Sequence, residues 1–325
     1  MKCSAFWNYV NVRPGDRVYP CCRFKKPIAQ FQGDLEQTLN GPEYAALRAK
    51  SQAGEHISEC QKCYDEEALG HESLRMRLNN EYTFDEPRVK YLEIGMDNLC
   101  NLVCDGCNSE FSSSWIIKEK QLYGAALNKK LTINEINSIP SSIEKILFLG
   151  GEPLITNKHL SVLKLHPNPA ECNIIYNTNA SYIPTLECKD EWTKFKKVHF
   201  ILSVDGVAEV NEKVRGGSVW QDTLDFIQYC RDNNYTFEFN TVLHYNNWFD
   251  LENLVEFMRD YNDWYINILT YPAHLAINKL STTQLHTFLQ TAETLTFPNK
   301  NYIINYVNEA LNNSQGEYYE KLDQR

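Results

Sequence analysis

The stretch Asn98-Leu99-Cys100-Asn101-Leu102-Val103-Cys104-Asp105-Gly106-Cys107 places three cysteines in one short segment, here called the cysteine loop. The C-x3-C-x2-C spacing lets three thiolates turn toward a common point, and thiolate ligands select iron–sulfur clusters or zinc. Three ligands leave a fourth position open, which an exogenous molecule can occupy. The loop therefore predicts a metal centre that binds a further ligand.

Two other interpretations of the cysteine loop carry less weight. Cysteine is often buried for packing alone, so the three thiols could be structural. A closed zinc site would need a fourth protein ligand nearby, and the following residues, Asn108-Ser109-Glu110-Phe111, contain no cysteine or histidine. We therefore favour an open cluster over buried thiols or zinc.

The cysteine loop resembles the signature of the radical S-adenosylmethionine (SAM) superfamily. The resemblance implies a 4Fe-4S cluster on Cys100, Cys104 and Cys107, with the amino and carboxylate groups of SAM chelating the open iron. Many members carry an aromatic residue directly before the third cysteine, where this chain has Gly106. The difference removes a packing surface for adenine at this position but leaves the three ligands in place.

Composition places the chain in a broad class. With 325 residues and 43% hydrophobic residues, it can form one large domain and a small one. No apolar run reaches the length of a membrane span and the N-terminus lacks an apolar signal segment, so we expect a cytoplasmic protein without a membrane partner. Eleven cysteines then indicate metal ligands rather than disulfides, and the formal charge of -10 argues against nucleic-acid binding.

Residues 1–85 form a segment with further cysteines, namely Cys3, the pair Cys21 and Cys22, and the C-x2-C pair Cys60 and Cys63. A turn at residues 13–17 predicts a hairpin that brings Cys3 close to Cys21 or Cys22. A helix that starts at residue 42 and ends before the C-x2-C pair returns that pair toward the hairpin. Four such ligands make a closed site, which spacing alone assigns equally to zinc or to a second iron–sulfur cluster.

This N-terminal segment resembles the twitch form of the SPASM auxiliary-cluster module, placed before the radical SAM core. The resemblance rests on the run Cys60-Gln61-Lys62-Cys63-Tyr64-Asp65-Glu66-Glu67, followed by Gly70, Ser73, Arg75 and Asn79. It implies an auxiliary 4Fe-4S cluster on Cys3, Cys60, Cys63 and one of Cys21 and Cys22, of which we favour Cys21.

Residues 86–280 repeat a pattern of strand, loop and helix about six times. The predicted strands are residues 89–96, 143–149, 173–177, 197–204, 236–243 and 265–271. Such alternation forms right-handed parallel units, and six of them make an α/β fold with a partial (β/α)6 barrel. Parallel barrels carry their chemistry at the carboxyl ends of the strands, where the cysteine loop falls. Residues 281–325 read as a C-terminal helical extension.

The turn Gly150-Gly151-Glu152-Pro153 follows an apolar strand. By itself a Gly-Gly pair usually marks only a turn, although it also allows a backbone to approach a ligand closely. Together with the cysteine loop, the turn resembles the GGE motif of the superfamily. The resemblance implies that Gly150, Gly151 and Glu152 contact the amino group of SAM.

Polar residues follow several predicted strands. Asn179, Ser203 and Arg215 could serve turns alone. In proteins that the chain resembles, the positions of Ser203 and Arg215 approach the SAM carboxylate or ribose, so we count these three residues as SAM contacts. Within the barrel, Glu93 and Glu238 are candidate proton acceptors, because an unpaired carboxylate inside an apolar strand is costly unless it has a role.

The resemblance implies a radical SAM enzyme that cleaves SAM to methionine and a 5'-deoxyadenosyl radical, which removes hydrogen from a substrate carbon. A one-electron donor such as flavodoxin or ferredoxin would reduce the cluster. Twitch and SPASM proteins indicate a peptide substrate, as in peptide maturation, or else a small molecule. The competing hypothesis is a non-catalytic iron–sulfur or zinc scaffold.

Overall fold

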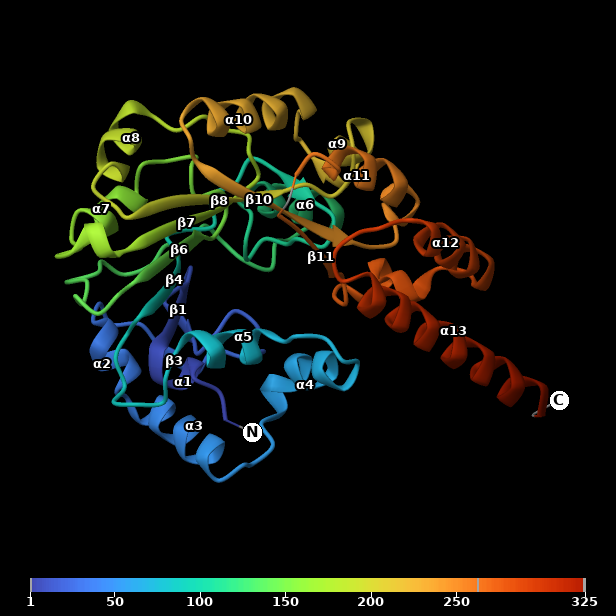
Figure 1. Ribbon diagram of the computed structural model, residues 1–325, viewed down its shortest axis with the longest axis horizontal. Coiled ribbons are helices and arrows are strands. Elements are labelled where there is room, and N and C mark those ends of the chain that lie inside the picture. Colours follow the sequence, from blue (N-terminus) through green and yellow to red (C-terminus); the bar gives the residue numbers. More distant parts are fainter. Residues whose placement is uncertain (1, 262, 324–325) are drawn as a thin grey trace.

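A nine-stranded sheet is the centre of the computed structural model, which describes residues 2–261 and 263–323 (Figure 1). The strand order is β11-β10-β8-β7-β6-β4-β1-β2-β3. The strands are Tyr9–Arg13 (β1), Arg17–Tyr19 (β2), Ala29–Gln30 (β3), Tyr91–Gly95 (β4), Lys145–Leu149 (β6), Asn173–Thr178 (β7), Lys197–Ser203 (β8), Thr236–Leu243 (β10) and Trp264–Ile268 (β11). Two short strands, β5 (Val103–Cys104) and β9 (Arg215–Gly216), pair separately.

The six predicted barrel strands, β4, β6, β7, β8, β10 and β11, are neighbours in chain order and all run parallel. The connections between them carry α6 (Ser113–Tyr123), α7 (His159–Leu163), α8 (Leu186–Trp192), α9 (Glu209–Val214), α10 (Trp220–Asp232) and α11 (Leu251–Met258). In Figure 1, α7, α8 and α10 lie over one face of the sheet. The expected α/β fold with a partial (β/α)6 barrel is confirmed.

Alternate residues of each barrel strand face opposite sides of the sheet. On the helix-covered side, Tyr176 and Phe200 are fully buried and pack against Trp192 of α8, whose indole Nε1 donates to the Tyr176 hydroxyl at 2.8 Å. On the other side, which we call the inner face, residues such as Ile175 and Ile201 remain partly exposed. The sheet is therefore buried on its outer face and accessible on its inner face.

The N-terminal hairpin extends the barrel sheet. β1 and β2 form the predicted antiparallel pair, and β1 also lies parallel to β4, with Asn11 opposite Glu93. Val10 and Val12 of β1 belong to the main hydrophobic core, so burial of these side chains favours the pairing. The domain boundary predicted near residue 85 therefore crosses a continuous sheet.

Five short helices surround this hairpin, at the lower left of Figure 1. They are α1 (Ala5–Asn8), α2 (Leu35–Leu39), α3 (Pro42–Gln52), α4 (Gln61–Ala68) and α5 (Leu74–Glu81). Part of this segment has a hydrophobic cluster of its own, built around Phe6, Trp7 and Tyr9. The N-terminal segment thus shares a sheet with the barrel, but some of its apolar side chains form a separate hydrophobic cluster.

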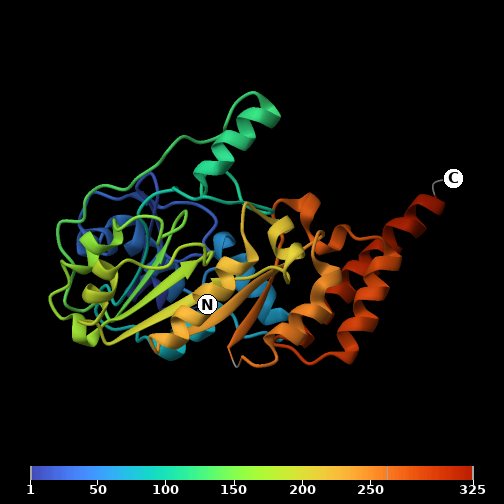
Figure 2. The same cartoon turned by 90° about the horizontal axis from the view of Figure 1, so that it is seen from above.

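The C-terminal segment is helical, with α12 (Thr282–Thr294) and α13 (Lys300–Asp323). A capping box between Ser281 and Gln284 starts α12, whose Leu285 and Phe288 are buried in the main core. Figures 1 and 2 show α13 extending away from the body, and Figure 2 shows α6 projecting on another side.

Short 3-10 helices span Ser58–Cys60, Pro169–Glu171, Trp248–Asp250, Ala273–Leu275 and Ile277–Lys279. Among the described residues, no helix combines the length and apolar character needed to cross a membrane.

Tyr44 provides a test of how the N-terminal hairpin is held. Its fully buried hydroxyl lies 2.9 Å from the Tyr9 carbonyl and 3.1 Å from the Tyr19 carbonyl. We expect Tyr44→Phe to lower the free energy of unfolding by about 1–3 kcal/mol, because buried carbonyls lose their donor. Urea unfolding measures the change, and Tyr123→Phe, at a side chain that is 75% exposed, is the control. Equal stabilities of the two variants would contradict the role of Tyr44.

Candidate functional site

A cavity of about 340 Å³ opens where the barrel strands end at their carboxyl termini. It is lined by residues from the cysteine loop, from the turn after β6, from the ends of β7 and β8, and from β9. All nine residues predicted for the SAM-binding cluster or for SAM are among them: Cys100, Cys104, Cys107, Gly150, Gly151, Glu152, Asn179, Ser203 and Arg215. The fold thus brings the separate predicted segments to one place.

The cysteine loop is anchored by Asn98, which the sequence analysis did not single out. Its buried side chain donates to the Ser109 and Lys129 carbonyls, each at 2.9 Å, and accepts from the Leu131 amide at 2.8 Å. A single amide group therefore satisfies three backbone groups on both sides of α6. Asparagine at a strand end was the available signal, but it is equally typical of turns.

The first turn of α6 holds the cysteine loop from the outside. The hydroxyls of Ser113 and Ser114 donate to the Cys100 carbonyl at 3.1 and 2.8 Å, and Nε1 of Trp115 donates to the Cys104 carbonyl at 3.1 Å. These bonds fix two of the three cysteines through their backbones. A serine run at a helix start predicts capping, and here it also positions the loop.

The glycine turn after β6 contacts the cysteine loop directly. The Gly151 amide donates to the Asp97 carbonyl at 2.9 Å, and the Glu152 amide donates to the Leu99 carbonyl at 2.7 Å. A Cβ on Gly151 would lie 2.0 Å from the Leu99 oxygen, and one on Gly150, at φ +133°, would lie 2.6 Å from the Asp97 oxygen. The glycines do allow a close approach of two backbones. The backbone that they approach is that of Asp97 and Leu99.

The Glu152 carboxylate is occupied by donors of the protein itself. Oε1 accepts from the Thr178 hydroxyl at 2.7 Å and the Leu154 amide at 3.0 Å, and Oε2 accepts from the Asn179 amide at 2.7 Å. The side chain is buried, and burial raises the pKa of this carboxyl. The expectation that Glu152 binds the SAM ammonium stays a prediction. What the geometry shows is that Glu152 connects the turn after β6 to the end of β7.

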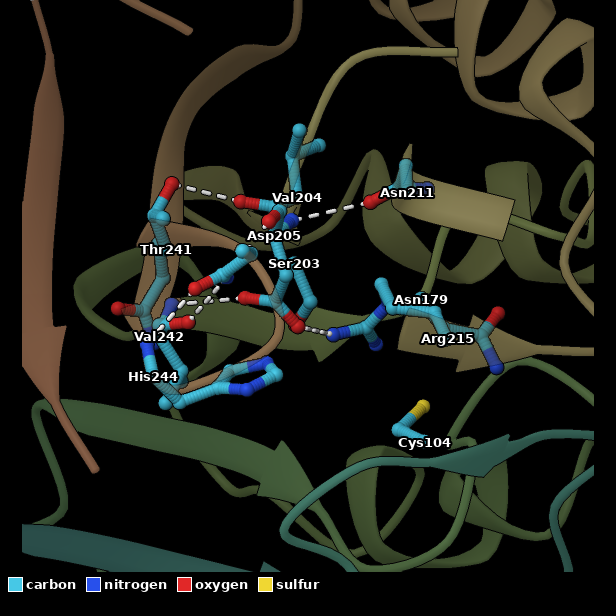
Figure 3. Close-up of polar contacts among 12 residues, drawn as sticks. Cys104, Asn179, Ser203, Val204, Asp205, Asn211, Arg215, Thr241, Val242 and His244 are labelled. Carbon is cyan, nitrogen blue, oxygen red and sulfur yellow. Dashed lines mark hydrogen bonds and ion pairs between the residues drawn. The ribbon is translucent and has the colours of Figure 1, made fainter. Parts of the chain in front are cut away.

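Arg215 lines the cavity beside the cysteine loop, and Figure 3 shows it between Asp205 and Cys104. Its Nη1 donates to Asp205 Oδ2 at 2.6 Å, and the β5–β9 pairing sets it opposite Cys104. Asp205 Oδ1 also accepts from the Val242 amide at 2.7 Å, so its carboxylate is fixed from two sides. The Arg215 Nε is buried with no hydrogen-bond partner among the described residues. One donor of the guanidinium therefore remains available.

The two remaining predicted SAM contacts, Asn179 and Ser203, line the same cavity and have fewer hydrogen bonds to the protein than Glu152. Asn179 Nδ2 donates to Asn101 Oδ1 at 2.9 Å and lies 3.8 Å from Cys100 Sγ. The Ser203 hydroxyl donates to Asn177 Oδ1 at 3.3 Å. Asn179 thus reaches the cysteine loop and Ser203 reaches β7, and both line the cavity, where a ligand can replace these protein partners.

Gly106 lies directly beside Leu269, the residue that follows the edge strand β11. Its φ is +74°, and a Cβ at this position would lie 2.9 Å from Leu269 Cδ1, just after β11. A side chain before the third cysteine would have to displace the end of Leu269, which itself lines the cavity, and the positive φ would strain its backbone. The missing aromatic residue is thus matched by an apolar side chain from the opposite side of the barrel.

A second pocket brings together the four favoured auxiliary cysteines, Cys3, Cys21, Cys60 and Cys63. Burial raises the pKa of Cys3 to about 12 and that of Cys60 to about 12. Such thiols keep their protons unless a metal replaces them, and the same holds for the core thiol of Cys230, so the meeting of four thiols is the feature that indicates a metal centre. Four thiols from three separate segments of the chain suit a fully ligated centre.

The residues that carried the SPASM-like resemblance brace this pocket. Glu67 accepts from the Ser73 hydroxyl at 2.5 Å and pairs with Arg75, which lines the pocket. Asn79 accepts from the Ser4 amide at 2.8 Å, beside Cys3. The motif therefore holds the chain around the cysteines.

Cys22 lies outside this pocket. The residue as a whole is exposed, but its thiol lies beside the buried Tyr9 and Glu93 on the inner face, and burial raises the pKa of this thiol to about 12. Glu93 is buried and accepts hydrogen bonds from the Tyr9 hydroxyl and from Asn11 Nδ2, the latter at 2.8 Å. Burial raises the pKa of Glu93. Of the adjacent cysteines, Cys21 thus faces the auxiliary pocket and Cys22 faces the barrel.

Other charged and amide residues on the inner face pair with each other. Glu238 lies 3.6 Å from His199 on the neighbouring strand β8. Asn240 accepts from Asn267 Nδ2 at 2.7 Å. Neither residue is isolated in an apolar setting. Glu93, which is buried, therefore remains our candidate proton acceptor.

The donor chemistry of both cysteine groups fits iron–sulfur clusters. Among the described residues, no three His, Cys, Asp or Glu side chains converge as the ligands of a single ion do. A cubane makes a different demand, because each cysteine binds a separate iron. Three thiols beside an open cavity match a cluster with one free iron, and four thiols in the smaller pocket match a closed one.

The comparisons with known proteins agree with this class of site. The chain belongs to the radical SAM superfamily, whose family model matches residues 96–258. The family model described as an iron-sulfur cluster-binding domain, SPASM, matches residues 3–64. Radical SAM proteins are enzymes that use a 4Fe-4S cluster and SAM, and the SPASM match supports an auxiliary cluster.

One curated relative is the GTP 3',8-cyclase of Sulfurovum sp. (strain NBC37-1), 24% identical over 180 residues, which are 46% of this chain. The chain spans 54% of that relative. Among solved structures, anSMEcpe with bound AdoMet has a TM-score of 0.46 at 17% identity, covering 63% of this chain and 57% of that one. Streptococcus suis SuiB bound to precursor peptide SuiA has a TM-score of 0.40 at 14% identity, covering 77% and 60%.

Gly151→Ala tests the contact between the glycine turn and the cysteine loop. The added Cβ cannot fit 2.0 Å from the Leu99 oxygen, so we expect a loss of about 3 kcal/mol or more in unfolding free energy and a lower iron content. Thermal unfolding and iron analysis measure both. The control is Gly54→Ala, where no atom lies within 4 Å but φ is +72°, so only a backbone cost of about 1–2 kcal/mol applies. A Gly151 variant no worse than the control would contradict the contact.

Proposed function

We propose that this protein is an enzyme that cleaves SAM reductively and removes a hydrogen atom from a substrate carbon. The observation that carries the proposal is the single cavity at the strand ends, where the three thiols of the cysteine loop and six predicted SAM contacts meet. Cys100, Cys104 and Cys107 would hold the cluster. When bound, the cluster and SAM supply one-electron chemistry that yields methionine and a 5'-deoxyadenosyl radical.

The protein supplies position and charge around that chemistry. Arg215 lines the cavity, is held by Asp205 and has an Nε that no described residue uses, so we assign it to the carboxylate of SAM. Glu152 keeps the β6 turn tied to the end of β7, and the glycine turn exposes its backbone beside the cysteine loop. Asn179 and Ser203 complete the polar lining as ligand donors.

We assign the second pocket to an auxiliary 4Fe-4S cluster on Cys3, Cys21, Cys60 and Cys63. The support is the meeting of these four thiols in one buried place, with Cys22 outside it. A centre with four protein ligands has no position for SAM, so its role is electron transfer or substrate positioning. As units of function, we propose residues 1–85 for the auxiliary module, 86–280 for the barrel and 281–325 for the extension.

We place the substrate on the inner face of the sheet, between the two cysteine sites. Glu93 is buried there beside Tyr9 and Asn11, which makes it our candidate proton acceptor. A peptide is the substrate class that we favour, because partly exposed amides such as Asn177 and Asn240 can pair with a polypeptide backbone. The sequence match to a GTP 3',8-cyclase supports a small molecule as the second candidate.

The SAM site is tested by replacing Cys100, Cys104 and Cys107 together with alanine. We expect one 4Fe-4S cluster to be lost and 5'-deoxyadenosine formation with dithionite to be abolished, because only these thiols line the SAM cavity. Iron analysis and chromatography of the products measure both. Cys230→Ala, at a buried core position, is the control for removing a cysteine. Wild-type 5'-deoxyadenosine formation by the triple variant would refute the assignment and favour a scaffold role.

The auxiliary site is tested with the double variant Cys60→Ala/Cys63→Ala. We expect less iron and retained SAM cleavage in the absence of substrate, because this pocket is separate from the SAM cavity. The matched control is Cys22→Ala, which should keep the wild-type iron content, since Cys22 lies outside the pocket. Full iron in the double variant would remove the auxiliary cluster, and loss of iron in the control would assign the fourth ligand to Cys22.

A further inference from the structure

A groove of about 870 Å³ lies on the outer side of α6, between the helix and residues 126–131. We call it the α6 groove, and Ile117, Lys120, Leu127, Lys129 and Lys130 are among its lining residues. Figure 2 shows α6 projecting from the body of the protein. The groove is therefore accessible to a large partner.

Large apolar side chains are exposed on α6 and the segment after it, and two of them, Ile117 and Leu127, line the α6 groove. Ile117 is 62% exposed, Leu122 57%, Tyr123 75% and Leu127 84%. Single exposed apolar residues are ordinary, whereas a group of them on one projecting element indicates a contact surface.

The charge around the α6 groove is opposite to that of the whole chain. Lys120, Lys129 and Lys130 are exposed, while the chain has a formal charge of -10. The one glutamate of α6, Glu119, is buried and turned inward, where it accepts from the Ser109 and Leu127 amides. The groove thus presents apolar side chains with a positive rim.

The same segment forms the outer wall of the cysteine loop. Ser113 and Ser114 line the groove, and their hydroxyls bond the Cys100 carbonyl. The cysteines face the SAM cavity, which is lined from the strand ends and does not share lining residues with the groove. A partner in the groove therefore approaches the cysteine loop from behind without blocking the cavity.

We propose that the α6 groove docks an acidic one-electron carrier protein that reduces the cluster on the cysteine loop. The inference rests on the proposed function, whose chemistry takes one electron from outside: the carrier is oxidised by one electron and the cluster is reduced by one. An acidic surface around an exposed apolar cofactor edge complements a lysine-rimmed apolar groove, and such complementarity raises the association rate.

Other occupants fit the α6 groove less well. A second copy of this chain in a two-fold dimer would bring the lysines of the two grooves together, and like charges oppose that contact. The substrate has to reach the cavity on the other side of the cysteine loop, because the hydrogen atom is removed there.

The charge is tested with Lys120→Glu/Lys129→Glu/Lys130→Glu, reconstituted with iron and supplied with SAM. With reduced flavodoxin as the probe at low ionic strength, we expect 5'-deoxyadenosine formation to fall at least tenfold, because the positive rim is reversed. With dithionite, which needs no docking surface, we expect a rate within twofold of wild type. The matched control is Lys50→Glu/Lys196→Glu/Lys197→Glu, which makes the same charge change at exposed positions elsewhere and should keep the flavodoxin rate.

The apolar contact is tested with Ile117→Ser/Leu127→Ser, which changes no charge and should also lower only the flavodoxin-driven rate. Binding of oxidised flavodoxin to immobilised protein gives a reading that requires no SAM cleavage, so failure of docking is distinguished from failure of the proposed function. Equal binding and equal rates for wild type and the lysine variant would overturn the proposal. Sedimentation that shows a dimer broken by Ile117→Ser/Leu127→Ser would also overturn it and assign the groove to a second copy.

Discussion

The contact between two backbones, the glycine turn after β6 and the cysteine loop after β4, is the constraint on which the candidate site depends. Two amides of the turn donate to the carbonyls of Leu99 in the loop and of Asp97 directly before it, and no Cβ fits at Gly151. The side chain of Glu152 also accepts hydrogen bonds from Thr178 and Asn179, which ties the turn to the end of β7. Three neighbouring strand ends are thereby held in one arrangement, which makes a cavity of fixed shape at the mouth of the barrel.

A second wall of the cavity, next to the cysteine loop, is fixed by an ion pair. Asp205 holds Arg215 by an ion pair and is itself held by the Val242 amide of the neighbouring strand. A buried guanidinium with a carboxylate on one side retains affinity for a second anion on its free side, because burial makes an unused donor costly. The site therefore combines a preorganised backbone wall with a cationic wall, which suits a ligand that carries both an amine and a carboxylate.

The chain has two sides with respect to the cysteine loop. One side is the cavity and the inner face of the sheet, where Glu93, Tyr9 and the exposed Cys22 lie near the N-terminal hairpin. The other side is α6, whose serines support the loop and whose outer surface is apolar and basic. Because β1 pairs with β4, the N-terminal segment and the barrel share one sheet.

The sequence by itself determined the parallel strands, the cysteine loop and the glycine turn, because apolar runs, cysteine spacing and glycine pairs are local signals. The resemblance of residues 60–67 to a known module also implied an auxiliary cluster on Cys3, Cys60, Cys63 and one of Cys21 and Cys22, and Glu67 of this run accepts a hydrogen bond from Ser73 shortly after it. Only the tertiary structure decided that Glu152 is taken up by Thr178 and Asn179, that Cys22 faces the barrel, and that β1 joins β4. These features depend on contacts between residues far apart in the chain, such as Asn11 and Glu93, which are 82 positions apart. Local propensity does not encode such pairings, because they form only when burial of both partners selects one register.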